Sequence, residues 1–357
     1  MAEIRVGVLG LVHDHVWGNL RTLAVQEGAR LVAVADPNPP LIDKVRAEYA
    51  PDETYGNYEE MLEKARLDAV FIFADNASAA PLTEMATARG LHVMTEKPMA
   101  ATLAQADRMF IAARQAGTML MVNWPTAWNR EIRHAFELAI AGEIGDIYQV
   151  KYRSAHGGPK EYGCSPYFYE WLYDRERNGA GAYMDYCCYG VNIARYLLGM
   201  PSRVMAMANR LVKEYVSVDD TGIIVMQYPR AIAVAEASWT QVGAEPSGGP
   251  IIYGTRGTLI VRRKAALGEG QRAGGGQLDL VTNEYPYGKT LVVPTTSEQD
   301  SSGPAYFLEC LRSQKEPTGL CGAQVSRDTQ EILEAGLIAA RRGSDVSLPL
   351  GPYASPV

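Results

Sequence analysis

The first third of the chain alternates short apolar runs with amphipathic segments, and this alternation restricts the possible folds more than any other feature. The apolar runs have the length of buried strands and lie at residues 4–9, 31–35, 69–74, 92–94 and 118–122. The segments between and after them have helical periodicity and lie at residues 15–27, 41–50, 58–66, 79–89 and 102–116. Buried strands that alternate with helices predict a doubly wound parallel sheet, which binds ligands beyond the carboxyl ends of its strands.

The pattern changes after residue 122, where strand-like runs follow one another with few helices between them. These runs lie at residues 147–155, 203–213, 221–228, 231–241, 250–253, 257–262, 278–282 and 290–294. Helical segments are expected at residues 128–142, 183–198, 303–313 and 322–342, and a glycine-rich loop at 268–276. We therefore predict an α/β protein of two domains: residues 1–122 with the parallel sheet, and residues 123–357 with an open, mostly antiparallel sheet.

Charge and cysteine content exclude several classes of protein. The net charge is −7 and there is no cluster of Lys and Arg, so we expect neither a nucleic-acid partner nor an anionic membrane surface. No run approaches the ~20 apolar residues of a membrane span. The five cysteines form no CxxC pair, and the start of the chain lacks the pattern of a signal peptide. These features predict a cytoplasmic protein with reduced thiols.

The turn after the first strand predicts a dinucleotide site, although it departs from the usual G-x-G-x-x-G pattern. Gly10 holds the first glycine position, whereas Val12 and His15 occupy the second and third. The turn still opens a helix, whose N-terminus can receive a diphosphate. His13 and His15 either contact phosphate through an imidazole N–H or are packing and capping residues. Because no cysteine or acidic ligand set stands near this His-x-His pair in the sequence, we predict no metal site.

Polar residues at the ends of the next strands extend this site. Asp36 ends the second apolar run, and a carboxylate there accepts hydrogen bonds from ribose hydroxyls and repels a 2′-phosphate. The chain therefore favours NAD over NADP, although an aspartate before Pro37 also suits a simple turn. Asp75 and Asn76 end the third run and either contact the cofactor or form a turn that caps the next helix.

Three segments resemble the Gfo/Idh/MocA family, which includes glucose–fructose oxidoreductase and inositol dehydrogenase. They are Val93-Met94-Thr95-Glu96-Lys97-Pro98, Gly142-Glu143-Ile144-Gly145, and Gly179-Ala180-Gly181-Ala182-Tyr183-Met184-Asp185. The resemblance covers essentially the whole chain. It implies a Rossmann domain, an open-sheet domain, and pyridine-nucleotide oxidoreduction of sugars, cyclitols or similar polyols. It also implies a cis peptide before Pro98, and contacts from Glu96 and Lys97 to the cofactor and from Lys97 to the substrate.

The resemblance further implies a catalytic group of Lys97, Asp185 and Tyr189. Relatives commonly carry an aspartate and, four residues later, a histidine on the long helix; here Tyr189 replaces the histidine. An i, i+4 spacing places two side chains on one helix face, so both reach one substrate. A neutral phenol is a weak base at neutral pH, and a nearby ammonium such as that of Lys97 would stabilise the phenolate. Without such a role, Tyr189 is a packed aromatic residue.

Further residues are candidates for binding the substrate. Trp124, Tyr167 and Trp171 stand in aromatic segments that suit the C–H faces of a sugar ring, although they equally suit a core edge or an interface. His156 follows the first strand of the second domain and either faces the substrate or is solvated. Asn192 lies three residues beyond Tyr189, close to the same helix face, and is a candidate hydrogen-bond partner for the substrate.

The main hypothesis is an NAD-dependent dehydrogenase of a sugar, cyclitol or glycoside hydroxyl, active as a homodimer or homotetramer through the second-domain sheet. One alternative is an NAD-dependent glycosidase that works by oxidation and elimination and recycles its cofactor. Another is a non-catalytic, NAD-binding sensor, which the altered glycine pattern and the missing histidine favour.

Overall fold

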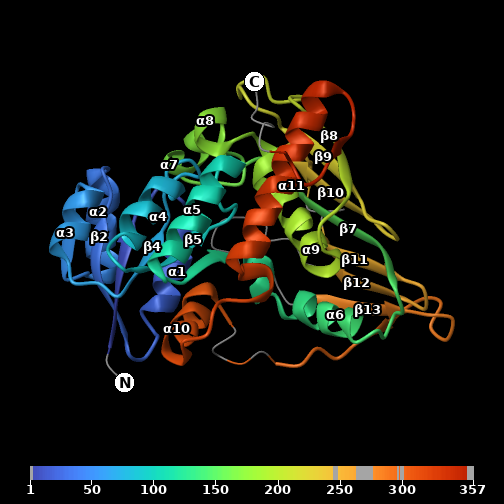
Figure 1. Cartoon of the computed structure of the whole chain (residues 1–357), viewed down its shortest axis with the longest axis horizontal. Helices are drawn as coiled ribbons and strands as arrows, with labels where there is room; N and C mark the ends of the chain where they lie inside the picture. The colour runs from blue at the N-terminus through green and yellow to red at the C-terminus, as the bar shows by residue number, and fades with distance from the viewer. Residues whose placement is uncertain (1–2, 244–247, 263–275, 296, 298–300, 352–357) are drawn as a thin grey trace. The chain divides into compact units, whose positions relative to one another are not determined.

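The computed structural model describes residues 3–243, 248–262, 276–295, 297 and 301–351, which form two compact units (Figure 1). The first unit contains Met1–Trp128, Glu176–Gly179 and Thr296–Arg327. The second contains Asn129–Arg175, Ala180–Thr295 and Asp328–Val357. The sequence placed everything after residue 122 in one domain, but two later segments belong to the first unit. Residues 268–275 of the expected glycine-rich loop lie outside the described residues.

The first unit is built on a parallel sheet, as the alternating pattern predicted. Its strands are β1 (Ile4–Leu9), β2 (Ala29–Ala35), β3 (Glu53–Tyr55), β4 (Ala69–Ile72), β5 (His92–Glu96) and β6 (Leu120–Asn123). Their order is β3-β2-β1-β4-β5-β6, and every paired strand is parallel. This is the doubly wound order that binds dinucleotides where the strand order reverses, between β1 and β4. The sequence missed only the short β3.

The helices of the first unit follow the predicted segments. They are α1 (His15–Leu23), α2 (Pro39–Tyr49), α3 (Tyr58–Lys64), α4 (Ala79–Thr87), α5 (Leu103–Ala116) and α10 (Gly303–Ser313). Their starts have local causes: Thr102 and Gln105 form a capping box at α5, and Asn57 caps α3. α10 belongs here because its aromatic side chains pack against this unit, including Phe307 against Phe71 of β4. A packing partner this distant in the chain leaves no local signal in the sequence.

The second unit contains the open sheet that the strand-rich pattern predicted. Its strands are β7 (Ile147–Ala155), β8 (Arg203–Asn209), β9 (Thr221–Gln227), β10 (Ile232–Ser238), β11 (Gly248–Gly254), β12 (Thr258–Arg262), β13 (Gln277–Val281), β14 (Lys289–Thr290) and β15 (Val346–Ser347). Among the described residues their order is β14-β13-β12-β11-β7-β10-β9-β8-β15. β7 and β10 pair in parallel and the other neighbours are antiparallel.

Helices cover one face of this sheet. The helices of the unit are α6 (Arg130–Ile140), α7 (Pro166–Leu172) and α9 (Cys188–Leu198), and α8 (Arg175–Asn178) and α11 (Ala323–Arg342) cross the unit boundary. The prediction of one regular helix over residues 183–198 was wrong at its start. Residues Tyr183–Cys187 form a π-helical turn whose hydrogen bonds span one residue more than in an α-helix. Asp185 therefore stands in the π-helical turn and Tyr189 in α9.

The opposite face of the sheet carries apolar side chains at alternate positions of β8, β9 and β10. Met205 lies opposite Val225, and Met207 lies opposite Ile223. These four side chains are all exposed, as is Ile232 of β10. A contiguous apolar surface of this kind is typical of an association site.

Backbone atoms of the first unit pack closely against Gly10 in the turn after β1. Its φ is +88°, and a Cβ there would lie 2.7 Å from the backbone nitrogen of Ala74. We expect Gly10→Ala to lower the free energy of unfolding by at least about 3 kcal/mol, from strain and backbone overlap together. Gly18→Ala in α1 is the matched control, since nothing lies within 4 Å of its added methyl group. It should stabilise the protein by about 1 kcal/mol. Urea unfolding of both variants tests this, and equal stabilities would contradict it.

Candidate active site

Polar side chains gather where the strands of the first sheet end. Asp36 follows β2, Asp75 and Asn76 lie beyond β4, and Glu96 and Asn123 are the last residues of β5 and β6. All five are buried. The carboxyl ends of parallel strands meet at one edge of the sheet, and this is the edge at which doubly wound folds bind their ligands.

Asp36 links the turns that follow β1 and β2. Its carboxylate accepts hydrogen bonds from the backbone nitrogen of Leu11 at 2.6 Å and from the backbone nitrogen of Asn38 at 2.7 Å. The side-chain amide of Asn38 donates a third, at 2.8 Å. Burial raises the pKa of Asp36, while these hydrogen bonds act in the opposite direction. With three lone-pair sites filled, about one remains for a ribose hydroxyl.

Asp75 and Asn76 are engaged with the short segment Glu176–Gly179, which belongs to the same unit. Asp75 Oδ2 accepts two hydrogen bonds of 2.8 Å from the guanidinium of Arg177, and Oδ1 accepts one from the backbone nitrogen of Ser78. The amide of Asn76 donates to Asn178 Oδ1 at 2.8 Å. Both side chains thus hold a distant segment in place, and Asp75 also forms the turn before α4 that the sequence left open as an alternative.

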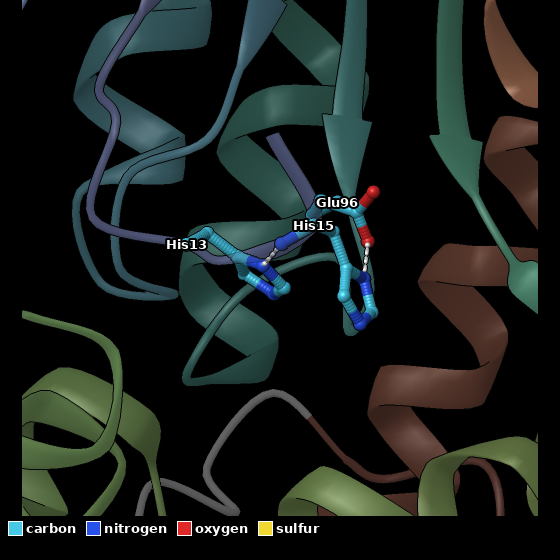
Figure 2. A group of neighbouring side chains, drawn as sticks. All are labelled: His13, His15 and Glu96. Atoms are coloured by element: carbon cyan, nitrogen blue, oxygen red, sulfur yellow. Dashed lines mark hydrogen bonds and ion pairs between the residues drawn. The ribbon is translucent and has the colours of Figure 1, made fainter. Parts of the chain in front are cut away.

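His13, His15 and Glu96 form a cluster between the turn after β1 and the end of β5 (Figure 2). His15 Nδ1 lies 3.0 Å from Glu96 Oε2, and His13 Nδ1 accepts a hydrogen bond of 3.3 Å from the backbone nitrogen of His15. Asn123 donates to Glu96 Oε1 at 2.7 Å. Burial lowers the pKa of His13 well below its usual value, with smaller contributions from the charges of His15 and Lys97. His13 is therefore neutral at physiological pH.

The same cluster bears on the metal prediction. Imidazole and carboxylate groups are ligand types for transition metals, and the ligand atoms of the three residues lie within 4.8 Å of one another. Here, however, His15 and Glu96 are hydrogen-bonded to each other, and neighbouring amides satisfy the rest of the carboxylate. A hydrogen-bonded network accounts for the cluster without a metal ion, and the absence of a metal stays a prediction.

Lys97 follows Glu96 at the end of β5 and is only 3% exposed. Its backbone nitrogen lies 3.3 Å from Glu96 Oε2, and the peptide bond to Pro98 is cis, as the resemblance implied. A buried ammonium next to the carboxyl edge of the sheet is a strong electrostatic group, because little water screens it.

The second unit has its own polar cluster around the π-helical turn. Trp239 Nε1 donates to Asp185 Oδ2 at 3.2 Å. The ring of Tyr186 lies 6.2 Å from that of Tyr189 and 5.0 Å from that of His156, centroid to centroid. The turn therefore brings Asp185, Tyr189 and His156 into one neighbourhood.

His156 is a neutral hydrogen-bond donor in this cluster. Its Nδ1 accepts a hydrogen bond of 2.8 Å from the backbone nitrogen of Gly158, which places the proton of the neutral ring on Nε2. Tyr162 stacks on one face of the ring at 4.9 Å. Burial lowers the pKa of His156 to about 4, against a smaller opposing effect of Asp185.

This pKa shift predicts a loss of stability in acid. Between pH 6.5 and about 4 the unfolded chain binds a proton at His156 that the folded protein does not, so stability falls as the pH falls through this range. From pH 7 to pH 5 we expect this residue to remove about 2 kcal/mol. His156→Asn keeps an acceptor for the N–H of Gly158. Between pH 7 and pH 5 its free energy of unfolding, measured by urea titration, should fall correspondingly less than that of the wild type. His134→Asn is the control, because His134 lies 3.1 Å from Glu137 on α6, and it should lose as much stability between pH 7 and pH 5 as the wild type.

Three of the substrate candidates are buried and have partners within the protein. Trp124 and Trp171 are 0% and 1% exposed; Trp124 donates to Ser326 Oγ at 3.0 Å, and Trp171 packs edge-on against Phe168. Asn192 is fully buried, and its amide lies 3.3 Å from Thr329 Oγ1 of α11. Substrate contacts from these three side chains stay predictions. Tyr167, near the start of α7, is half-buried.

The sequence analysis did not identify several residues at the strand ends of the first unit and around the π-helical turn of the second. They are Asn19, Asn123, Arg177, Asn178, Tyr186 and Trp239. Only Asn123 had a usable signal, because it ends an apolar strand at the ligand-binding edge. The others are identified by partners far away in the chain.

Family models match both parts of the chain. Residues 4–124 match the oxidoreductase family with an NAD-binding Rossmann fold, and residues 132–260 match the GFO/IDH/MocA C-terminal domain. A D-apiose dehydrogenase of Paraburkholderia graminis is 26% identical over 355 residues, which cover 97% of this chain and 89% of that protein. A D-xylose 1-dehydrogenase (NADP(+)) 2 of Haloferax volcanii is 34% identical over 169 residues, which cover 46% of this chain and 50% of that protein.

Solved structures agree with the fold. The aldose-aldose oxidoreductase of Caulobacter crescentus, complexed with glycerol, has a TM-score of 0.81 at 24% identity, covering 97% of this chain and all of that one. No helix among the described residues has the length and apolar character needed to cross a membrane. The two family models and the strand order together show that the chain belongs to the Gfo/Idh/MocA family of oxidoreductases with an NAD-binding Rossmann domain.

Proposed function

We propose that this protein is an NAD(H)-dependent dehydrogenase acting on a hydroxyl group of a sugar, cyclitol or glycoside. The observation that carries the proposal is the buried Lys97 beside Glu96 at the carboxyl end of β5. The relatives support the substrate class, since they are dehydrogenases of D-apiose and D-xylose and an aldose-aldose oxidoreductase.

The residues of the first unit suit a dinucleotide. Three features are those expected of such a site: the strand order reverses beside β1, α1 begins at His15 directly after the turn, and the acid Asp36 follows β2. The carboxylate of Asp36 favours NAD over NADP, because it would repel a 2′-phosphate. Gly10, Val12 and His13 form the turn, with Asp75, Asn76 and Glu96 at the neighbouring strand ends.

We assign the acid–base chemistry to Lys97 of the first unit and to Asp185 and Tyr189 of the second. Bound nicotinamide supplies a hydride acceptor. The ammonium of Lys97 polarises the substrate oxygen, and Asp185, held by Trp239, orients the hydroxyl. As a phenolate, Tyr189 would take the proton of the substrate hydroxyl, while hydride leaves the carbon that bears this hydroxyl. His156 Nε2 and the half-buried Tyr167 contribute further contacts to substrate hydroxyls.

The exposed apolar face of β8, β9 and β10 supports association into a homodimer or homotetramer. Two copies of the sheet face would bury the same side chains, Met205, Met207, Ile223, Val225 and Ile232.

The proposal is tested by incubating the protein with NAD+ or NADP+ and a panel of aldoses, cyclitols and glycosides. Growth of the reduced-nicotinamide absorbance with at least one polyol, faster with NAD+, is the expected result. Cleavage of a glycoside without this absorbance would favour the oxidation–elimination alternative. Binding of NAD+ with no turnover across the panel would count against a dehydrogenase.

A further inference from the structure

His156, which we place among the substrate contacts, begins a tight turn that runs to Tyr162. The N–H of Gly158 donates to His156 Nδ1 at 2.8 Å, and the N–H of Tyr162 donates to the carbonyl of Gly158 at 2.8 Å. The ring of Tyr162 stacks on the imidazole at 4.9 Å, with an angle of 15° between the two planes. The direction in which His156 Nε2 points therefore depends on the shape of this turn.

A buried lysine from another part of the same unit is paired with the turn. Lys213 Nζ lies 2.7 Å from Glu161 Oε1, and the side chain of Lys213 is 8% exposed, against 43% for that of Glu161. Lys213 Nζ also donates to the hydroxyl of Tyr215 at 3.0 Å, and this hydroxyl donates to Glu161. Burial and the hydrogen bond to Glu161 raise the pKa of Tyr215 to about 12, so the phenol remains a donor at neutral pH. Each of the three groups thus contacts the other two.

The ion pair packs directly against the backbone of Gly158. The φ of Gly158 is +120°, and a Cβ there would lie 2.5 Å from Glu161 Oε2 and 2.9 Å from Lys213 Nζ. A glycine is therefore needed both for the backbone conformation and for the space that the two charged groups occupy. The imidazole senses the same groups. Burial is the main cause of the low pKa of His156, and the charge of Lys213 lowers it further, whereas those of Asp185 and Glu161 raise it.

Lys213 itself stands on a rigid base. The carboxylate of Asp220 is fully buried and accepts hydrogen bonds from the backbone nitrogens of Leu211, Val212 and Lys213, at 3.0, 2.8 and 2.7 Å. The carbonyl of Asp220 accepts a hydrogen bond of 2.8 Å from the N–H of Trp239, directly after β10. The sheet thus fixes the backbone that carries the ammonium, and the ammonium is in place before any substrate binds.

We propose that Lys213 is a positioning residue: through its ion pair with Glu161 it fixes the turn at residues 156–162, and so aims His156 Nε2 at a substrate hydroxyl. This inference rests on the proposed function and adds a residue that acts only through His156. A donor held in one direction loses less conformational entropy on binding than a mobile one, so fixing it tightens substrate binding. A contact of this kind is equally strong in the ground state and the transition state, so its loss raises KM and leaves kcat unchanged.

Steady-state kinetics of Lys213→Met, with the best polyol from the panel, test the proposal. Methionine replaces most of the apolar stem, and the carboxylate of Glu161 that remains is exposed enough for water to solvate it. We expect the KM for the polyol to rise about 10-fold while kcat stays within about threefold of the wild-type value. The Kd for NAD+, measured separately, should not change.

Glu161→Gln breaks the same ion pair from its other side and should also raise KM with little change in kcat. The double variant should raise KM no further than Lys213→Met alone, because the pair acts as a unit. Arg195→Met is the matched control: Arg195 pairs with Asp328 at 2.7 Å in the same unit, and the two side chains are 21% and 8% exposed. It removes a comparably buried ion pair and should keep the wild-type KM.

The outcomes separate this inference from the proposed function. A wild-type KM in Lys213→Met, a fall in kcat as large as the rise in KM, or an equal rise in Arg195→Met overturns the inference alone. Effects of the two single substitutions that add up in the double variant also overturn it. If Lys213→Met does not fold, Glu161→Gln decides by the same criteria, since its side chain is partly exposed. Absence of wild-type turnover with every polyol would contradict the proposed function itself, and the inference with it.

Discussion

Replacing Lys97 by methionine should lower kcat by about 10³-fold, since the substitution removes the charge that polarises the substrate oxygen. Methionine nearly fills the volume of the lysine stem, which matters because Lys97 is buried. The circular dichroism spectrum should therefore change little, and any rise in the Kd for NAD+ from the lost cofactor contact should stay small beside the fall in kcat. Steady-state kinetics with the best polyol from the panel, together with a separate Kd measurement, test both parts of this expectation.

Lys64→Met provides the control for this substitution. Lys64 lies on α3, is largely exposed and pairs with Glu60 at 2.7 Å. An exposed pair of this kind contributes little to stability, and kcat should be unaffected. If Lys97→Met keeps more than about a tenth of the wild-type kcat, Lys97 does not take part in the chemical step. If the protein is instead a non-catalytic sensor, the variant should keep its biological effect.

Tyr189→Phe should lower kcat by about 10²- to 10⁴-fold if the phenol accepts the substrate proton. The rings of Tyr152 and Tyr186 each lie 6.2 Å from that of Tyr189, and phenylalanine keeps these ring contacts. Stability should therefore stay close to that of the wild type. The pH profile of kcat should also change shape, a result that a purely structural role would not produce.

The matched control is Tyr196→Phe, on the same helix. Tyr196 packs against Phe136 at 5.7 Å and is not part of the proposed site. A kcat for Tyr189→Phe within about threefold of the Tyr196→Phe value would show that another group accepts the proton. Tyr186 is a poor alternative, because burial and the charge of Asp185 raise its pKa well above the usual value.

The residues of the candidate site differ in how far the sequence could identify them. Lys97 and Asp185 stand in segments that resemble the family, and Asp36 stands directly after an apolar strand. Such positions are specified locally, because the end of a parallel strand lies at the ligand-binding edge whatever the rest of the chain does. The pairing of His15 with Glu96 joins residues 81 positions apart, and no periodic pattern carries that information.

The structure shows packing partners for side chains whose role the sequence left open. Trp124, Trp171 and Asn192 have side-chain chemistry that suits a sugar, yet their surroundings cover them. A tryptophan on an amphipathic segment has the same sequence signature in both cases, because the pattern identifies a buried face without identifying the residues that lie against it.

The sequence by itself determined the parallel sheet, the later open sheet and the position of Lys97, since side-chain periodicity and strand ends are local properties of the chain. Only the tertiary structure decided that α10 belongs to the first unit, that a π-helical turn carries Asp185, and that Asp75 pairs with Arg177. These features depend on contacts between distant residues. Their free energies arise from desolvation and hydrogen-bond geometry, which exist only after the chain has folded.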